Sequence, residues 1–322
     1  MEAIVFRFFF FLPCILAATA SAFTYDEEFE IHQPQIKVME NQQAIAESVA
    51  EMLVAKIRER NRCHARTVLG LATGKTVIPI YEAFVRRVLE EKLDLSQVYT
   101  FNLDEYLGIP NDSEKSLYHF MNTHLFSSLK CSVKYPKGLR EQQTFLPNGW
   151  AKSEDDLSPT EFRAFKKHFP KHLQGALFNE KEEMWVLKRR AAEYDRQIHR
   201  LGPIDIQILS LGVNGHIGLA EPGTPFNSRT HVVKLADSTR IENSRYYGES
   251  VEQFPEYAIT MGIGTILQAK KIVLLAYGKE KADVVKQTLD HPLSRFFPAT
   301  SLRLHPQVVL FIDQLAGEML GK

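Results

Sequence analysis

The sequence predicts an α/β fold with a doubly wound, mostly parallel sheet and helices on both faces. From Val68 onward, apolar runs of strand length alternate with longer segments of helical period, and this alternation is typical of βα units. Three of the predicted strands also end in polar loops, as expected where the strands of such a sheet meet a ligand.

The predicted strands are short apolar runs bounded by polar or glycine-containing segments. They lie at 35–38, 67–72, 98–103, 204–211, 258–261, 271–277 and 308–312.

The predicted helices are indicated by apolar spacing and capping residues. Apolar residues recur every four positions between Ile80 and Val88, which gives a helix one buried face. Ser116 is a typical N-cap for the next helix. Further helices are expected from about 183 to 200 and, briefly, after 312.

Residues 1–34 are unlike the rest of the chain. The apolar run at 6–20 is followed by Ala20-Ser21-Ala22, as in a signal peptide. The run is shorter than the roughly 20 residues of a membrane-spanning helix, so an anchor is the weaker interpretation, and a spurious extension from an upstream start codon is a further alternative. We expect residues 35–322 to form a single domain with a surface insertion at about 148–182.

Composition excludes several classes of protein. Lys and Arg total 39 and Asp and Glu total 39, so no basic surface is expected for nucleic acid or for an anionic membrane. The three cysteines, Cys14, Cys63 and Cys131, lack the spacing of zinc ligands, and no HExxH motif occurs. We therefore expect neither a metal site nor a disulfide scaffold.

The first polar loop, Thr73-Gly74-Lys75-Thr76, follows a predicted strand and precedes a helix. Its amides and hydroxyls at a helix N-terminus suit a phosphate group. The alternative is an ordinary turn that caps the helix, because the loop lacks the full pattern of a P-loop.

The second loop begins with Asp104-Glu105, two carboxylates at the end of a predicted strand. Neighbouring residues there point in different directions, so only one needs to face a cleft. Partial burial raises the pKa of a carboxyl group toward the range useful for a general base. The alternative is an acid that caps the loop beside a solvated neighbour.

The third loop contains Asn214, His216 and Glu221, with glycines on both sides of the histidine. A histidine with an orienting carboxylate is a proton-transfer pair, and the glycines leave room for a small molecule. The alternative is a structural histidine.

Two cations are candidates to reach the loop at 73–76, hereafter called the phosphate loop. These are Arg245 and Lys281. Because basic residues are usually solvated, the alternative is that either lies on an ordinary surface.

These loops together resemble the glucosamine-6-phosphate deaminase family, also called the glucosamine-6-phosphate isomerase family. The resemblance runs from about 36 to 320, and several motifs occur in order. The matching segments are GLATGKT (70–76), TFNLDEYLGIP (100–110), SLYHFMNTHLF (116–126), LGVNGHIGLAEPGTPFNSRTHVV (211–233), STRIENSRYY (238–247) and AITMGIGTILQAKKIVLLAYGKEK (258–281).

The resemblance implies a Rossmann-like fold and a cofactor-free, homo-oligomeric enzyme that converts glucosamine 6-phosphate and water to fructose 6-phosphate and ammonia. By the same resemblance, His216 opens the sugar ring with help from Asn214 and Glu221, and Asp104 moves the proton from carbon 2 to carbon 1. The phosphate is then held by Thr73, Gly74, Thr76, Arg245 and Lys281.

The chain also departs from the family pattern. Lys75 stands where a small residue is usual, so it either adds a phosphate contact or crowds the pocket, and Leu219 and Ala220 replace Phe and Asn. His231 and Val233 stand where regulated members have Arg and Lys, so we expect no activation by N-acetylglucosamine 6-phosphate.

The alternatives are a sugar-phosphate sensor without turnover and a related isomerase or 6-phosphogluconolactonase. A cytoplasmic location is expected despite the leader, because sugar phosphates are cytosolic.

Overall fold

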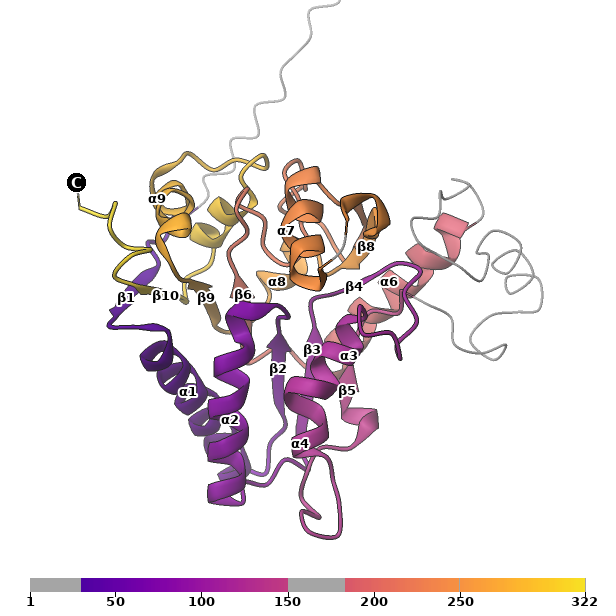
Figure 1. The fold of residues 1–322 in the computed structure, drawn as a ribbon. Helices are drawn as coiled ribbons and strands as arrows, with labels where there is room; N and C mark the ends of the chain where they lie inside the picture. Colours follow the sequence, from indigo (N-terminus) through magenta and orange to yellow (C-terminus); the bar gives the residue numbers. More distant parts are fainter. Residues whose placement is uncertain (1–29, 150–182, 249, 322) are drawn as a thin grey trace, which may run out of the picture. The chain divides into compact units, whose positions relative to one another are not determined.

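Seven strands pair in parallel in the order β1-β10-β9-β6-β2-β3-β5 (Figure 1). This computed structural model describes residues 30–149, 183–248 and 250–321, and the predicted α/β class is confirmed. The strands are β1 (Gln35–Met39), β2 (Thr67–Leu71), β3 (Val98–Asn102), β5 (Thr144–Phe145), β6 (Ile206–Ser210), β9 (Ile272–Ala276) and β10 (Val308–Asp313).

A second sheet of three antiparallel strands carries part of the loop region. It consists of β4 (Asp104–Tyr106), β8 (Tyr257–Thr260) and β7 (His231–Lys234), in the order β4-β8-β7. The predicted strand at 258–261 is therefore β8. Asp104 and Glu105 lie within β4 and not in a loop, because Asp104 pairs with Thr260.

Helices connect the strands of the large sheet. The α-helices are α1 (Gln42–Arg62), α2 (Ile78–Glu91), α3 (Leu117–Met121), α4 (Ser127–Leu129), α6 (Glu183–Leu201), α7 (Asp237–Tyr247), α8 (Ile263–Ile266) and α9 (Ala282–Asp290). A π-helical segment, Asn122–Phe126, joins α3 to α4, and 3₁₀ turns lie at Lys75–Val77, Glu141–Gln143, Val251–Gln253, Lys279–Lys281 and Pro298–Leu304.

The crossovers run in both directions across the large sheet. β1-α1-β2 and β2-α2-β3 step toward β5, whereas β5-α6-β6 and β9-α9-β10 step toward β1. Because such crossovers are right-handed, the two groups of helices cover opposite faces. The direction reverses between the neighbouring strands β2 and β6, and ligands bind at such a switch point.

Burial on both faces explains the composition of the central strands. Every residue of β2 and β9 is buried, as expected for parallel strands that are covered by helices on both sides. The predicted helix after the second strand is α2, whose Ile80, Phe84 and Val88 are buried in the core.

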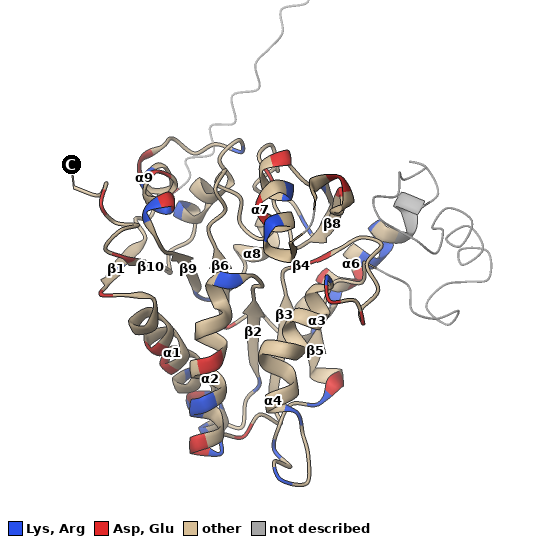
Figure 2. Ribbon diagram, viewed as in Figure 1, with Lys and Arg blue, Asp and Glu red and all other residues tan. Residues whose placement is uncertain are grey.

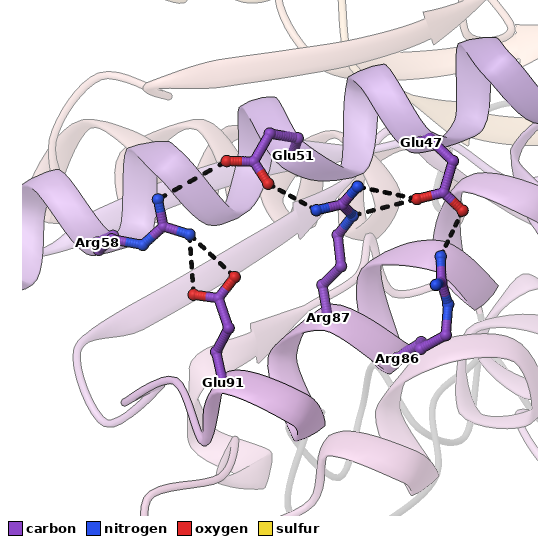
Figure 3. Close-up of polar contacts among 6 residues, drawn as sticks. All are labelled: Glu47, Glu51, Arg58, Arg86, Arg87 and Glu91. Carbon is purple, nitrogen blue, oxygen red and sulfur yellow. Dashed lines mark hydrogen bonds and ion pairs between the residues drawn. The ribbon is translucent and has the colours of Figure 1, made fainter.

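Helices α1 and α2 lie side by side (Figure 1), and their charged residues of both signs (Figure 2) form the ion pairs shown in Figure 3. Arg87 bridges two acids of α1, at 3.0 Å from Glu47 and 2.7 Å from Glu51. Arg58 of α1 contacts Glu91 of α2 at 2.8 Å. These partly exposed pairs link the two helices, and each contributes little stability on its own.

The chain after β10 differs from its prediction. A short helix was expected, but residues 314–321 form successive turns. The side chain of Asp313 accepts a hydrogen bond from the Ala316 amide at 2.8 Å, and this local bond competes with a regular helix.

Two predictions fall largely outside the described residues. Most of the leader lies at 1–29 and most of the insertion at 150–182, so both remain predictions. Ile31–Lys322 forms one compact unit. None of the described helices is both long enough and apolar enough to cross a membrane.

Candidate active site

A cavity of about 310 Å³ lies at the switch point of the large sheet, at the lower end of the volumes typical of small-molecule sites. The loops after β2 and β6 line it, together with β4, α7 and the turn before α9. Residues from all three polar segments that the sequence singled out therefore meet at one place.

The loop after β2 forms one wall, to which all four of its predicted residues contribute. Gly74 has φ +99°, and a Cβ there would meet nothing within 4 Å, so the glycine is required for the backbone turn and not for space. Lys75 is exposed, and its Nζ lies 5.1 Å from the centre of the Tyr246 ring. Lys75 therefore reaches toward α7 at the edge of the cavity and does not fill it.

The two carboxylates of β4 have different surroundings, as neighbouring residues of a strand must. Asp104 is buried and lines the cavity. Glu105 accepts hydrogen bonds from the amides of Leu117 and Tyr118, both at 3.0 Å, and from the Ser116 hydroxyl at 2.9 Å. Only Asp104 is available to a ligand, and Glu105 caps α3.

Burial raises the pKa of Asp104 to about 7, and the neighbouring Glu105 adds to the rise. Burial also raises the pKa of Glu105, although the hydrogen bonds that it accepts from α3 oppose the rise. A carboxyl group with a pKa near neutrality both accepts and returns a proton at physiological pH, which suits a general base that later acts as an acid.

His216 is held by Asn214, and Glu221 acts through that residue. Asn214 Oδ1 lies 2.7 Å from His216 Nδ1, and Asn214 Nδ2 donates to Glu221 Oε2 at 2.9 Å. Glu221 Oε2 itself lies 3.9 Å from His216 Nδ1. The carboxylate is therefore too far away for a hydrogen bond to the imidazole, and Asn214 stands between the two residues that the sequence predicted as a pair. A carbonyl oxygen on Nδ1 favours the tautomer with the proton there, which leaves Nε2 as the acceptor.

Burial lowers the pKa of His216, and the charges of Glu221 and Glu242 oppose that shift. The neutral imidazole is therefore favoured at pH 7, which is the form that accepts a proton.

The glycines around His216 serve different purposes. A Cβ on Gly212 would lie 2.3 Å from the His216 ring, so the ring packs directly on the backbone of that residue. At Gly215 the space belongs to the ring of Phe297, at 2.8 Å from such a Cβ, and not to a ligand as the sequence suggested. Gly218 lies near Asp104, whose Oδ2 would be 3.6 Å from the added atom.

The two predicted cations are placed differently. Lys281 lines the cavity with a side chain that is only 13% exposed, and its Nζ lies 3.5 Å from Glu242 Oε1. Arg245 is exposed on α7 and is not part of the cavity wall. The structure therefore brings Lys281, but not Arg245, to the phosphate loop.

One face of α7 was missed by the sequence reasoning. Glu242, Asn243 and Tyr246 line the cavity, and Thr239 Oγ1 lies 3.3 Å from His216 Nδ1. These residues recur at helical spacing of three and four, which was the available signal. The departures Leu219 and Ala220 are both buried, and Leu219 lines the cavity.

Among residues 30–149, 183–248 and 250–321, no group of three or more His, Cys, Asp or Glu is arranged to hold a metal ion.

Known proteins resemble this chain over most of its length. A family model described as glucosamine-6-phosphate isomerases/6-phosphogluconolactonase matches residues 40–310. The glucosamine-6-phosphate deaminase of Bacillus velezensis is 40% identical over 271 residues, 84% of this chain and 95% of the relative. That of Thermoanaerobacter pseudethanolicus is 35% identical over 280 residues, 87% of this chain and 92% of the relative.

Solved structures show the same fold. A monomeric glucosamine-6-phosphate deaminase has a TM-score of 0.72 at 33% identity and covers 88% of this chain and 99% of its own. A 6-phosphogluconolactonase from Leishmania guyanensis has a TM-score of 0.64 at 20% identity, covers 90% and 99%, and shows the fold alone. The family model spans most of the chain, and both relatives named above exceed 30% identity. The chain therefore belongs to the glucosamine-6-phosphate isomerase/6-phosphogluconolactonase family.

Proposed function

We propose that this protein is a glucosamine-6-phosphate deaminase, which converts glucosamine 6-phosphate and water to fructose 6-phosphate and ammonia. The observation that carries the proposal is one cavity lined by Asp104 and by His216, whose imidazole is linked through Asn214 to Glu221. The similarity to deaminases from several bacteria supports the same substrate and reaction.

His216 opens the sugar ring in this proposal. Its imidazole takes the proton of the anomeric hydroxyl and delivers a proton to the ring oxygen, so its net charge is unchanged at the end of the step. Asn214 holds the tautomer, and Glu221 stabilises the transient imidazolium from 3.9 Å.

Asp104 then takes the proton from carbon 2 of the open chain and returns it to carbon 1. The amine loses a proton as the carbon–nitrogen bond becomes an imine, and the aldehyde oxygen gains a proton as carbon 1 becomes an alcohol. Water then adds to carbon 2, which releases ammonia and leaves the ketone of fructose 6-phosphate. A base whose pKa is about 7 is close to its optimum for both halves of this transfer.

The phosphate lies against the loop after β2, close to Lys281. Thr73, Gly74 and Thr76 line that wall, and amides at the start of a helix favour an anion. Fixing the far end of the substrate in this way places carbon 2 against Asp104, which is a positional contribution to the rate.

The decisive measurement is ammonia and fructose 6-phosphate release by the purified protein from glucosamine 6-phosphate without added metal. Equal amounts of the two products support the proposal. Saturable binding of the sugar phosphate without release would instead indicate a sensor or an enzyme for another sugar, and hydrolysis of 6-phosphogluconolactone would indicate a lactonase.

We also propose that the enzyme works in the cytoplasm, where sugar phosphates are found, and that N-acetylglucosamine 6-phosphate does not activate it. The second point is checked by adding that ligand to the assay, and a clear rise in velocity would contradict it. The homo-oligomer expected from the resemblance stays a prediction.

A further inference from the structure

We propose that Glu242 competes with the substrate phosphate for Lys281 and thereby weakens phosphate binding at the cavity. The inference rests on the proposed function in one respect, since it takes the cavity to be a phosphate-binding site.

The geometry places the two charged groups together on the cavity wall. Glu242 Oε1 lies 3.5 Å from Lys281 Nζ, within ion-pair distance. Both residues line the cavity, as do Thr73, Gly74 and Thr76 of the phosphate loop. An anion held by that loop and by Lys281 must therefore share the lysine ammonium group with the Glu242 carboxylate, or displace the carboxylate from it.

The two side chains are buried to different extents, and this decides which of them can move away when a phosphate binds. The side chain of Lys281 is 13% exposed and that of Glu242 is 43% exposed. The lysine is thus confined near the cavity, whereas the glutamate has solvent into which it can withdraw. Because exposed ion pairs are weak, a phosphate with two charges and hydrogen-bonding amides around it displaces the carboxylate at a modest cost.

The Glu242 carboxylate matters for phosphate binding because few of the candidate cations line the cavity. Among the cations considered for the phosphate, Lys75 and Lys281 line the cavity, whereas Arg245 does not. Glu242 offsets one of these two charges and also repels a bound phosphate directly.

Glu242 is thus a positioning residue that sets phosphate affinity through Lys281. Removing its charge should tighten binding of every ligand that carries the phosphate, without changing the proton transfers at carbon 2. A carboxylate that instead holds Lys281 in its binding position would have the opposite effect, because its loss would weaken binding.

The test is calorimetric titration of the full-length protein with inorganic phosphate, which needs no turnover. For Glu242→Gln we expect the phosphate Kd to fall by about three- to tenfold, as expected for losing a partly exposed charge near a dianion. The KM for glucosamine 6-phosphate should fall in parallel, while kcat changes little. Asp237→Asn is the matched control, since Asp237 is an exposed acid on the same helix but outside the cavity wall.

Two further measurements separate the competing explanations. Glu242→Asp keeps the charge but withdraws it from Lys281, so its Kd should fall between those of the wild type and Glu242→Gln. In a Lys281→Met background, Glu242→Gln should give a much smaller change in Kd. Unchanged or weaker phosphate binding in Glu242→Gln overturns the proposal, whereas absent deaminase activity with tighter phosphate binding overturns only the proposed reaction.

Discussion

Gly212→Ala should disable the candidate active site while the fold survives. A methyl group on Gly212 would lie 2.3 Å from Cε1 and Nε2 of His216, where ordinary contact begins at 3.4 Å. The ring must therefore move by about 1 Å, which breaks its 2.7 Å contact with Asn214. A displacement of that size costs about 100-fold in rate. The cost in folding free energy should be about 1–3 kcal/mol, as for an overpacked core.

The assay compares kcat/KM for ammonia release with thermal unfolding of the same samples. Gly202→Ala is the matched control. Gly202 has φ +111° with open space around a Cβ, so that variant should lose about 1–2 kcal/mol through backbone strain while its kcat/KM stays unchanged. If Gly212→Ala keeps kcat/KM within about threefold of the wild type, the assigned role of the His216 ring is incorrect.

The other predictions concern β4. Asp104→Asn should abolish exchange of the carbon-2 proton with solvent deuterium while substrate still binds, and exchange at the wild-type rate would refute the assignment of the base. Because burial raises the pKa of Asp104 to about 7, kcat/KM should fall below about pH 7 as the base becomes protonated. A profile that is flat down to pH 5 would contradict this. The same raised pKa means that the carboxyl group stabilises the fold fully below its unfolded pKa and loses that contribution as the pH rises through about 7. Glu105→Ala should cost about 3 kcal/mol, because it leaves the buried donors at the start of α3 without their acceptor. An unchanged thermal midpoint would show that solvent replaces the cap.

Local chemistry made much of the fold predictable. β2 and β9 are mostly apolar and buried throughout, and Ser116 caps α3 by accepting hydrogen bonds from the amides of Tyr118 and His119. Each signal depends on neighbours in the sequence. Helix α1, which was not predicted, carries the same kind of signal in Ile45, Val49 and Ile57.

Most of the segments that form the candidate site could also be predicted from the sequence. The loops at 73–76 and 214–221 follow predicted strands, and parallel strands bring their carboxyl ends to one edge of a sheet. The motifs that resemble the family added the roles of Asp104 and His216. Lys281 and the loop at 73–76 line the same cavity.

Tertiary structure alone decided how the side chains around the cavity divide their work. Glu105 caps α3 only because residues 116–118 fold back onto β4, and Phe297 fills the space at Gly215 from far along the chain. The exposure of Arg245 depends on how α7 is rotated against the cavity. The sequence determined which groups are present and on which elements they lie, whereas their contacts arise between segments distant in the chain, whose packing no local pattern encodes.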